Sequence, residues 1–188
     1  MKNNLVAIIA GALMVVALPA FAANSDNLAN NNSASLLNKA YQINKSEEDM
    51  ASLLSNKAGD NLALSTLATT LKDDHEANES AVKSLASEEN ITLESYRPDN
   101  TLKSQLDNLN GAAFDEAFLK QEATDHREAL HTFEETRHQV ENRDMQLYID
   151  ETIPLIRAHL EMIENVRRDL TAAGPIASAV HYRESSSR

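Results

Sequence analysis

Three histidines lie inside apolar helical faces, where an ionisable side chain is costly to bury. At about 100° per residue, His126 lies at the centre of a face on which four apolar residues fall within about 60° of it: Leu119, Ala123, Leu130 and Phe133. Glu122 lies one turn earlier on the same face. His75 and His159 occupy similar positions in two other segments. Because burial of such a group without a partner is unfavourable, these residues are expected to be partners of one another.

Each histidine is close to the midpoint of its helical segment, and Glu47 has the same place in the first segment. Helices of a bundle lie side by side, so mid-helix residues meet in one layer whichever way the helices run. The sequence therefore predicts one metal-binding layer of five residues: His75, His126, His159, Glu47 and Glu122. Three neighbouring polar residues are expected to orient the rings: Asp74, Asp125 and Asn78.

The layer has two interpretations. Three imidazoles and one or two carboxylates form a candidate site for Zn, Fe, Mn or Cu, which accept neutral nitrogen and carboxylate oxygen ligands. The same residues could instead form a hydrogen-bond network that fixes helix register and binds no ion. The Glu-x-x-His pairs of standard dimetal bundles are missing at these positions. Oxidase or ferroxidase chemistry is therefore not supported, no catalytic residue is assigned, and both interpretations stay open.

Helical periodicity divides the chain into four long segments. They span about residues 35–58, 61–89, 112–140 and 143–170, and residues 101–109 are expected to form a short helix. Gly59-Asp60 is typical of a helix stop followed by an N-cap. Pro154 lies inside the last segment and predicts a kink or break one turn before His159.

This pattern indicates an all-α fold. The connections are short between the first two and between the last two long helices, whereas residues 90–111 separate the middle pair. One long crossover between long helices 2 and 3 is typical of a ferritin-like four-helix bundle rather than of a simple up-down-up-down bundle. We therefore expect the ferritin-like arrangement.

The N-terminus predicts export. Residues 1–22 contain Lys2, an apolar run from Leu5 to Leu18 and a small-residue cleavage site, the pattern of a secretory signal peptide. An uncleaved anchor is the alternative. Three further divisions are expected: a disordered lead-in at 23–34, the bundle domain at 35–172 and a flexible tail at 173–188. We expect a periplasmic or secreted protein without strong membrane insertion after cleavage.

Composition restricts the partners and the chemistry. The chain is acidic, with a formal net charge of −12, and it has no cysteine. This charge disfavours binding to nucleic acid and to anionic membrane surfaces, and the lack of cysteine excludes disulfides and thiolate ligands. The sequence has no phosphate-binding loop, nucleophile elbow or His-Glu-x-x-His motif. An envelope protein or a second copy of the chain is the partner class that is left.

Four stretches together resemble the exported bacterial domain-of-unknown-function family 4142: LKDDHEAN (71–78), SLASEENITL (84–93), GAAFDEAFLKQEATDHREALHTFE (111–134) and TIPLIRAHL (152–160). The resemblance covers about residues 35 to 170 and implies a ferritin-like four-helix bundle in the cell envelope, with no established activity. The positions that match the family's pattern are Asp74, His75, His126, His159, and Glu47 or Glu48. Periodicity favours Glu47, and Glu122 lies outside the pattern.

The sequence thus predicts an exported helical bundle of unknown activity whose His/carboxylate layer is a candidate transition-metal site. The alternative is a non-catalytic envelope interaction or stress protein in which the buried histidines are structural. An enzyme would also need an open coordination position and a pocket that reaches solvent. Neither can be read from the sequence.

Overall fold

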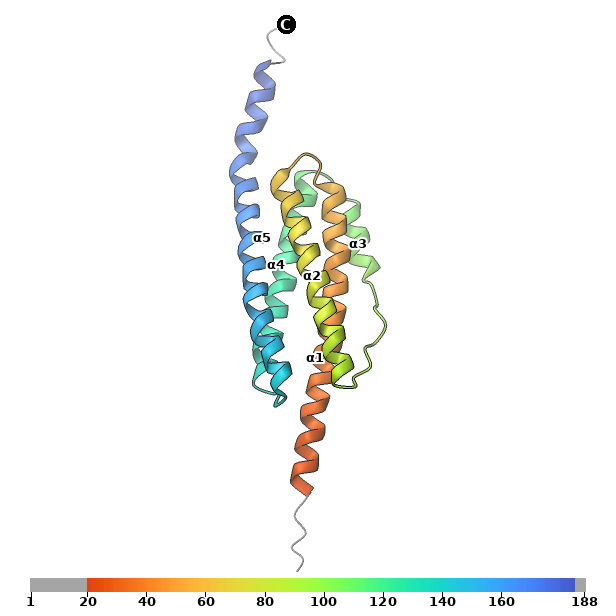
Figure 1. The fold of residues 1–188 in the computed structure, drawn as a ribbon. Helices are drawn as coiled ribbons and strands as arrows, with labels where there is room; N and C mark the ends of the chain where they lie inside the picture. The colour runs from red at the N-terminus through yellow and green to blue at the C-terminus, as the bar shows by residue number, and fades with distance from the viewer. Residues whose placement is uncertain (1–19, 185–188) are drawn as a thin grey trace, which may run out of the picture.

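The computed structural model describes residues 20–184, with side chains from residue 31 to residue 172. The described residues form five helices and no strand: α1 (Ala20–Lys57), α2 (Leu62–Glu88), α3 (Asn100–Asp107), α4 (Ala112–Arg137) and α5 (Arg143–Glu184) (Figure 1). The prediction of an all-α fold is confirmed. Most of the predicted signal peptide, residues 1–19, lies outside the described residues.

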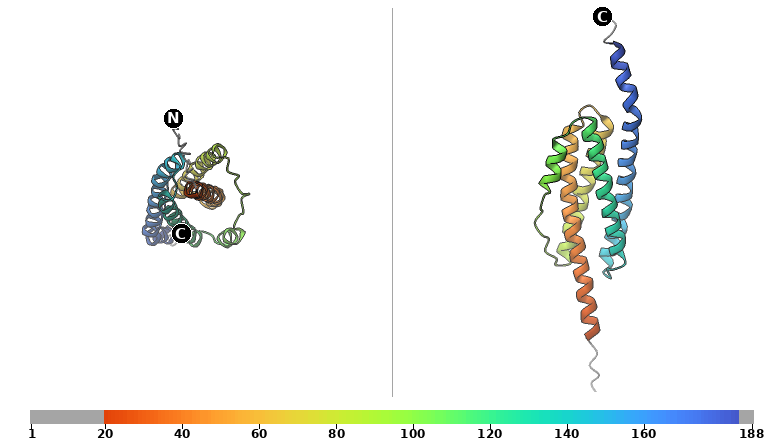
Figure 2. Two further views of the ribbon diagram at one scale, coloured as in Figure 1. Left: turned by 90° about the horizontal axis from the view of Figure 1, so that it is seen from below. Right: turned by 180° about the vertical axis from the view of Figure 1, so that it is seen from behind.

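Four of the helices lie side by side, and α3 lies outside them (Figure 1, Figure 2). α1 packs on α2, α2 on α5, α5 on α4 and α4 on α1, while α3 contacts α4. α1 and α5 run in one direction and α2 and α4 in the other, so each neighbouring pair is antiparallel. Because α2 and α4 run the same way, the chain that joins them must return along the length of the bundle.

The core consists of two apolar clusters at opposite ends of the bundle. One is centred on residues such as Leu54 and Phe118, and the other on residues such as Leu37 and Ile149. Between the clusters the four long helices contribute buried polar residues, which we call the polar layer: Asn44, Glu47, His75, Glu122, His126, Thr152 and His159. The layer interrupts an otherwise apolar core near the middle of each helix.

The turn between α1 and α2 shows what ends one helix and starts the next. α1 ends just before Gly59, which has φ +55°, a left-handed conformation that glycine adopts without strain. The Asn61 side chain caps α2, because its Oδ1 accepts hydrogen bonds from two amides of the first turn. The helix stop at Gly59 is confirmed, whereas the predicted cap at Asp60 is wrong by one residue.

The crossover segment, residues 89–99, lies along α1 and is held there by side chains. Gln42 Nε2 donates to two carbonyl oxygens of the segment, and Gln42 Oε1 accepts from the amide of Arg97 at 2.9 Å. The Tyr96 hydroxyl donates to Asp49 Oδ2 at 3.1 Å. The segment contains no helix, as expected around Pro98. These contacts bind the connection to the first helix of the bundle.

The start of α1 differs from the prediction. The helix begins at Ala20, so residues 23–34, which were expected to be a disordered lead-in, are helical. Asn32 Nδ2 donates to the carbonyl of Gln139 at 3.1 Å, and Ser33 is buried. The bundle therefore begins with polar contacts, which an apolar periodicity does not detect.

α5 runs unbroken through Pro154 and past Gly174-Pro175 to Glu184. Of the kink or break predicted at Pro154, the break is wrong, because the helix continues through this residue. Residues 173–184, which were expected to belong to a flexible tail, are helical. Pro154 and Asp150 are both exposed, so the Asp150 carbonyl that loses its helical N–H partner faces water.

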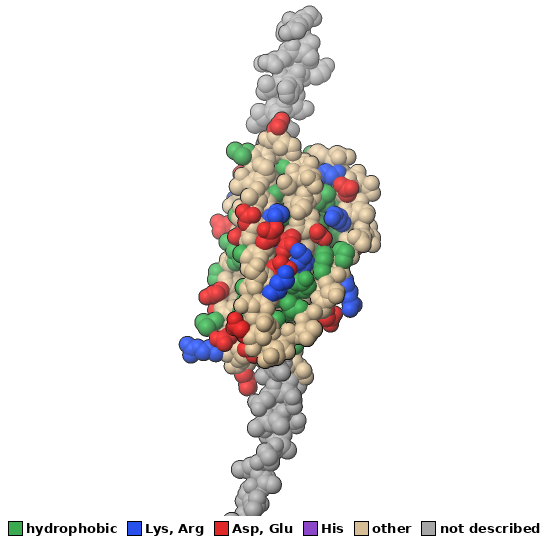
Figure 3. All heavy atoms as spheres, turned by 45° about the vertical axis from the view of Figure 1, so that its right-hand side comes forward, with side chains coloured by type: hydrophobic (Ala, Val, Ile, Leu, Met, Phe, Trp, Pro, Cys, Tyr) green, Lys and Arg blue, Asp and Glu red, His purple; other side chains and the backbone are tan. Residues whose placement is uncertain are grey.

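None of the described helices carries an apolar stretch of the length that a bilayer span requires. The face beside the crossover segment instead mixes acidic, basic and apolar side chains (Figure 3). Elsewhere on the surface, Arg157 pairs with Glu134 at 2.6 Å and Arg137 with Asp150. Exposed pairs of this kind contribute little to stability, so the fold depends on the two apolar clusters.

Candidate metal centre

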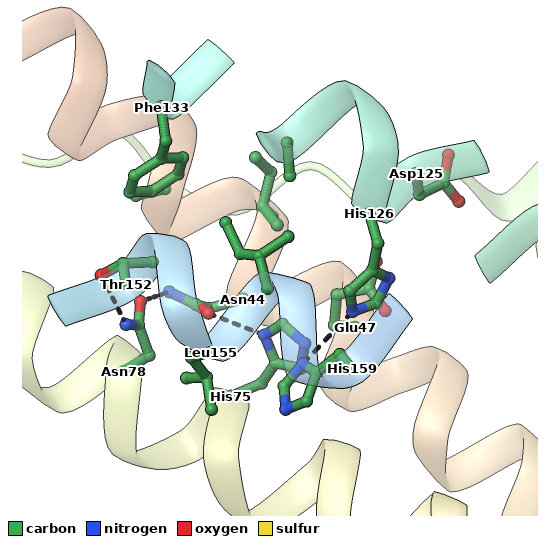
Figure 4. Close-up of a pocket in the computed structure, with 14 residues that line it drawn as sticks. Asn44, Glu47, His75, Asn78, Asp125, His126, Phe133, Thr152, Leu155 and His159 are labelled. Carbon is green, nitrogen blue, oxygen red and sulfur yellow. Dashed lines mark hydrogen bonds between the residues drawn. The ribbon is translucent and has the colours of Figure 1, made fainter. Parts of the chain in front are cut away.

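Three imidazole rings meet in the polar layer, one each from α2, α4 and α5 (Figure 4). The centroids of the His75, His126 and His159 rings are 5.2–5.6 Å apart, and the rings are tilted or edge-on rather than stacked. All three are buried, with exposed fractions of 1–7%. One nitrogen of each ring lies within 4.8 Å of the others. The three histidines therefore face a common centre.

The helices aim these rings inward because neighbouring positions on each face are apolar and packed. The flanking residues on the same helices belong to the two apolar clusters: Leu71 and Val82 beside His75, Ala123 and Ala129 beside His126, Ile156 and Ile163 beside His159. Rotating a helix until its histidine faced outward would expose these apolar neighbours to water. The orientation of the histidines thus follows from the packing on either side of them.

Two of the rings are held by an acceptor at one nitrogen. His126 Nδ1 is 2.9 Å from the carbonyl oxygen of Glu122, and His159 Nε2 is 2.9 Å from Asp74 Oδ2. A carbonyl or an ionised carboxylate only accepts, so the rings donate at these atoms. In the neutral rings, His126 Nε2 and His159 Nδ1 are then unprotonated.

The proton position on His75 follows from a chain of hydrogen bonds. The Thr152 hydroxyl donates to the Tyr148 carbonyl at 2.7 Å, so its oxygen accepts from Asn78 Nδ2 at 3.3 Å. Asn78 Oδ1 then accepts from the Tyr148 hydroxyl at 2.9 Å and from Asn44 Nδ2 at 2.8 Å. Asn44 Oδ1 is left to accept from His75 Nδ1 at 2.9 Å. The unprotonated nitrogen of His75 is therefore Nε2.

All three rings thus present a lone pair to the centre. His75 Nε2 has no hydrogen-bond partner, and His126 Nε2 is 3.3 Å from His159 Nδ1. While both rings are neutral, neither of the two close nitrogens can donate to the other, so their lone pairs repel unless a cation lies between them. In a tetrahedral site, Zn–N bonds of about 2.0–2.1 Å put ligand nitrogens about 3.3 Å apart. The spacing matches that of a metal site.

Two carboxyl groups lie beside His126. One oxygen each of Glu47 and Glu122 lies within 4.8 Å of the other and of a His126 nitrogen. Both Glu122 oxygens and Glu47 Oε2 have no hydrogen-bond partner outside this pair. Glu48, the other candidate for the family's glutamate, pairs instead with Lys45. The five residues expected to form one site are therefore arranged as two trios that share His126.

Burial sets the protonation of the layer. Desolvation lowers the pKa of His75 well below its usual value, and it also lowers the pKa of His126, although Glu47 opposes the shift there. Desolvation, followed by repulsion from Glu47, raises the pKa of Glu122 well above its usual value, and desolvation raises that of Glu47. Neutral imidazoles are the form that binds metals, and two coupled carboxyls share a proton when no cation is present.

A cavity of about 20 Å³ lies beside the rings (Figure 4). Much of its lining is apolar, from residues such as Phe133, Leu155 and Ile156. This volume holds about one water molecule. Three protein ligands and an adjacent space are the composition of a site with an open coordination position, whereas structural sites are closed by four protein ligands.

All the residues of the polar layer fall inside a matched sequence family. Residues 18–166 match the family model described as Domain of unknown function (DUF4142). The chain belongs to this family. The membership predicted from the four stretches is thereby confirmed. No curated protein and no solved structure matches the chain. The family description assigns no activity, so conclusions about function depend on the chemistry of the layer.

Two of the three residues expected to orient the rings are placed to do so. Asp74 accepts directly from His159, and Asn78 acts on His75 through Asn44. Such outer hydrogen bonds fix ring orientation and raise ligand basicity in metal sites. The layer therefore includes residues that orient the rings as well as the candidate ligands themselves.

Asp125 is not placed as expected. Its two carboxylate oxygens accept from Gln121 Nε2 at 2.9 and 3.0 Å, one turn earlier on α4. The neighbouring ring, His126, donates to a backbone carbonyl instead. Among the described contacts, Asp125 makes no hydrogen bond to a ring.

Sequence reasoning missed Asn44 and Thr152. Asn44 lies three residues before Glu47, and Thr152 lies seven residues before His159, so both are on the faces already identified as inward. Their exposed fractions are 4% and 5%. Counting inward amides and hydroxyls together with the ionisable residues would have found both.

Proposed function

We propose that this chain is a metal-binding protein in which His75, His126 and His159 ligate one divalent transition-metal ion. The observation that carries the proposal is the 3.3 Å separation of His126 Nε2 and His159 Nδ1, whose rings already donate to other acceptors. An ion between these atoms removes the repulsion of their lone pairs. The outer hydrogen bonds are of the kind that holds ligand histidines in metal sites.

Zn²⁺ is the expected occupant. Neutral imidazoles favour borderline divalent ions, and nitrogen sites bind Zn²⁺ and Cu²⁺ more tightly than Mn²⁺ or Fe²⁺. The absence of cysteine gives no preference for Cu(I). An ion held by three histidines supplies a Lewis-acidic position toward the cavity. The cavity volume restricts a further ligand to water or a molecule of similar size.

The proposal extends to fold topology and location. A ferritin-like arrangement is supported by the two antiparallel hairpins, α1–α2 and α4–α5, and by the long crossover segment that joins them. Export to the periplasm is supported by the signal-peptide pattern of residues 1–22. Mass spectrometry of the protein from the cell envelope tests this part, with an N-terminus at Ala23 as the expected result and an intact Met1 as the opposing one.

The competing function is a structural network, and one contact favours it. His159 Nε2 is 2.9 Å from Asp74 Oδ2, so a doubly protonated His159 would form an ion pair there and donate to His126 from Nδ1. That arrangement satisfies two rings without a metal. It leaves His75 Nε2 buried without a partner, whereas a metal ion accounts for all three nitrogens.

Elemental analysis of the protein, purified without chelator or nickel affinity, tests the proposal. We expect about one metal ion per chain in the wild type and none in the triple variant His75→Ala/His126→Ala/His159→Ala. His131→Ala is the control, because that side chain is 72% exposed. Added Zn²⁺ should raise the melting temperature of the wild type and the control only. The proposal would be contradicted by a wild type that contains no metal after purification and whose melting temperature does not change when Zn, Mn, Fe or Cu is added.

A further inference from the structure

Glu47 and Glu122 form a buried pair that the three-histidine site does not use. Glu47 comes from α1 and Glu122 from the neighbouring antiparallel helix α4. Their exposed fractions are 5% and 0%. Both oxygens of Glu122 and one oxygen of Glu47 have no hydrogen-bond partner outside the pair, whose two carboxyl groups are close enough to share a hydrogen bond when one is protonated. Buried carboxyl groups normally accept hydrogen bonds, so this pair requires an explanation.

No basic side chain neutralises the pair within the part of the chain whose side chains are described. The buried polar residues there include neither lysine nor arginine. The nearest candidate is His126, whose Nδ1 is 3.8 Å from Glu122 Oε2, too far for a hydrogen bond. This nitrogen donates instead to the Glu122 carbonyl. Two buried carboxylates cannot both ionise without a counter-ion, so the pair holds a shared proton or a metal ion.

The geometry of the pair suits a cation. One oxygen of Glu47 and one oxygen of Glu122 lie within 4.8 Å of each other. His126 is not counted as a ligand of this pair, because its Nδ1 donates to the Glu122 carbonyl and its Nε2 faces the other rings. Metal–ligand bonds of about 2.0–2.2 Å put two ligand atoms about 3–4 Å apart, so small side-chain movements would close a site. Carboxylate oxygens are ligands for hard divalent ions such as Mn²⁺, unlike the all-nitrogen group nearby.

A surface groove leads from solvent to Glu47, one member of the pair. The groove has a volume of about 350 Å³ and lies between α1 and α4, beside the crossover segment. Its walls include Glu47 and Asp125, which also line the cavity next to the histidines. Asp99 and Glu128 add acidic groups nearer the surface. The basic side chains of Lys39 and Arg97 also line the groove, so its charge is mixed. A cation could reach Glu47 from the side of the bundle through this groove.

We propose that Glu47 and Glu122 form a second cation position, which takes an oxygen-preferring divalent ion such as Mn²⁺ beside the three-histidine site. His126 lies between the positions, because its Nε2 faces the other rings while its Nδ1 lies nearer Glu122. The positions differ in ligand chemistry and can hold different ions. This inference goes beyond the proposed function and does not require that the histidine position be filled.

A two-metal titration tests the inference. The protein is stripped with chelator, loaded with one equivalent of Zn²⁺ and titrated with Mn²⁺, while the EPR signal of free Mn²⁺ is followed. The wild type should take up one Mn²⁺ per chain. Glu122→Gln and, independently, Glu47→Gln should lose this Mn²⁺ and keep the Zn²⁺. Glu116→Gln, at an exposed position of α4, should behave as the wild type.

A double variant, His75→Gln/His159→Gln, separates this inference from the proposed function. It should lose Zn²⁺ and still take up Mn²⁺. A wild type that binds Zn²⁺ through the histidines but takes up no Mn²⁺ overturns the second position alone, as does Mn²⁺ uptake that neither glutamine variant changes. Mn²⁺ uptake that needs Glu122, in a protein that binds no Zn²⁺, supports the second position and overturns the zinc proposal.

Discussion

The polar layer and the two apolar clusters are equally buried, but they are stabilised in different ways. Phe118 and Leu54, both 0% exposed, are held by contact with many apolar neighbours, and other apolar side chains of the same volume could replace them. In the layer each side chain needs a specific partner, as His159 needs Asp74. Burying such polar groups costs free energy, whereas burying apolar residues in their place would be favourable. The clusters therefore stabilise the fold, and the layer is the candidate site.

The largest effect on stability is expected from the apolar clusters. Phe118→Ala should lower the free energy of unfolding by about 3–5 kcal/mol, because it removes a fully buried ring and leaves a cavity. Urea denaturation measures the change. Leu147→Ala, at a side chain that is 48% exposed, is the control and should change stability by less than about 0.5 kcal/mol. Similar losses in both variants would mean that the cluster does not carry the stability.

Within the layer, the largest expected effect is on metal affinity. Asn44→Leu removes the acceptor for His75 Nδ1 and frees the ring to turn or to change tautomer. We expect the Zn²⁺ dissociation constant to rise about 10- to 100-fold, as for other groups that orient ligand histidines. Isothermal titration calorimetry measures it, with Asn165→Leu as a control at an exposed position of α5. An unchanged dissociation constant would show that the chain of hydrogen bonds through Asn44 does not support the site.

A smaller effect is expected in the pH dependence of metal-free stability. The pKa of Glu122 is raised by burial and by Glu47, so the folded state keeps a proton that the unfolded state releases above about pH 4.5. Wild-type stability should therefore fall as pH rises through the folded-state pKa, by up to about 1.4 kcal/mol per pH unit. Glu122→Gln removes this titration, so the stability of the wild type relative to the variant should decrease with rising pH.

Urea unfolding in the presence of chelator, at several values between about pH 5 and 8, measures this difference. His75 and His126 have lowered pKa values, so they reduce stability as pH falls below about 6.5, but they do so in both proteins. Their contribution largely cancels in the comparison. Parallel stability curves would contradict the assignment of a buried proton to the carboxyl pair.

Periodicity was sufficient to predict that the four long helices exist and which ionisable residues point inward. Apolar residues that recur at helical spacing define both the direction in which each side chain points and its height along the helix. The four long helices, the crossover around Pro98 and the three inward histidines follow from these two quantities. Glu47 was favoured over Glu48 for the same reason, and the structure places Glu47 in the layer.

The details that periodicity could not supply depend on side-chain torsions and on single-residue choices. The two trios around His126 differ in how far each side chain reaches, which a helical wheel does not describe. Asp125 had two possible partners, a ring across the bundle or Gln121 on its own helix, and the local partner is the one it contacts. Asp60 and Asn61 are both good capping residues, so the boundary depended on which one faced the first turn.

The attachment of the crossover segment to α1 also affects how copies of this chain can combine. Two hairpins joined by a long connection can exchange partners between chains when the connection swings free. Here Asn38 Oδ1 accepts from the amide of Glu94, and Gln42 binds backbone groups on both sides of Tyr96. The connection is thereby fastened to its own first hairpin. This attachment favours packing of the α4–α5 hairpin against the α1–α2 hairpin of the same chain, and it disfavours a domain-swapped dimer.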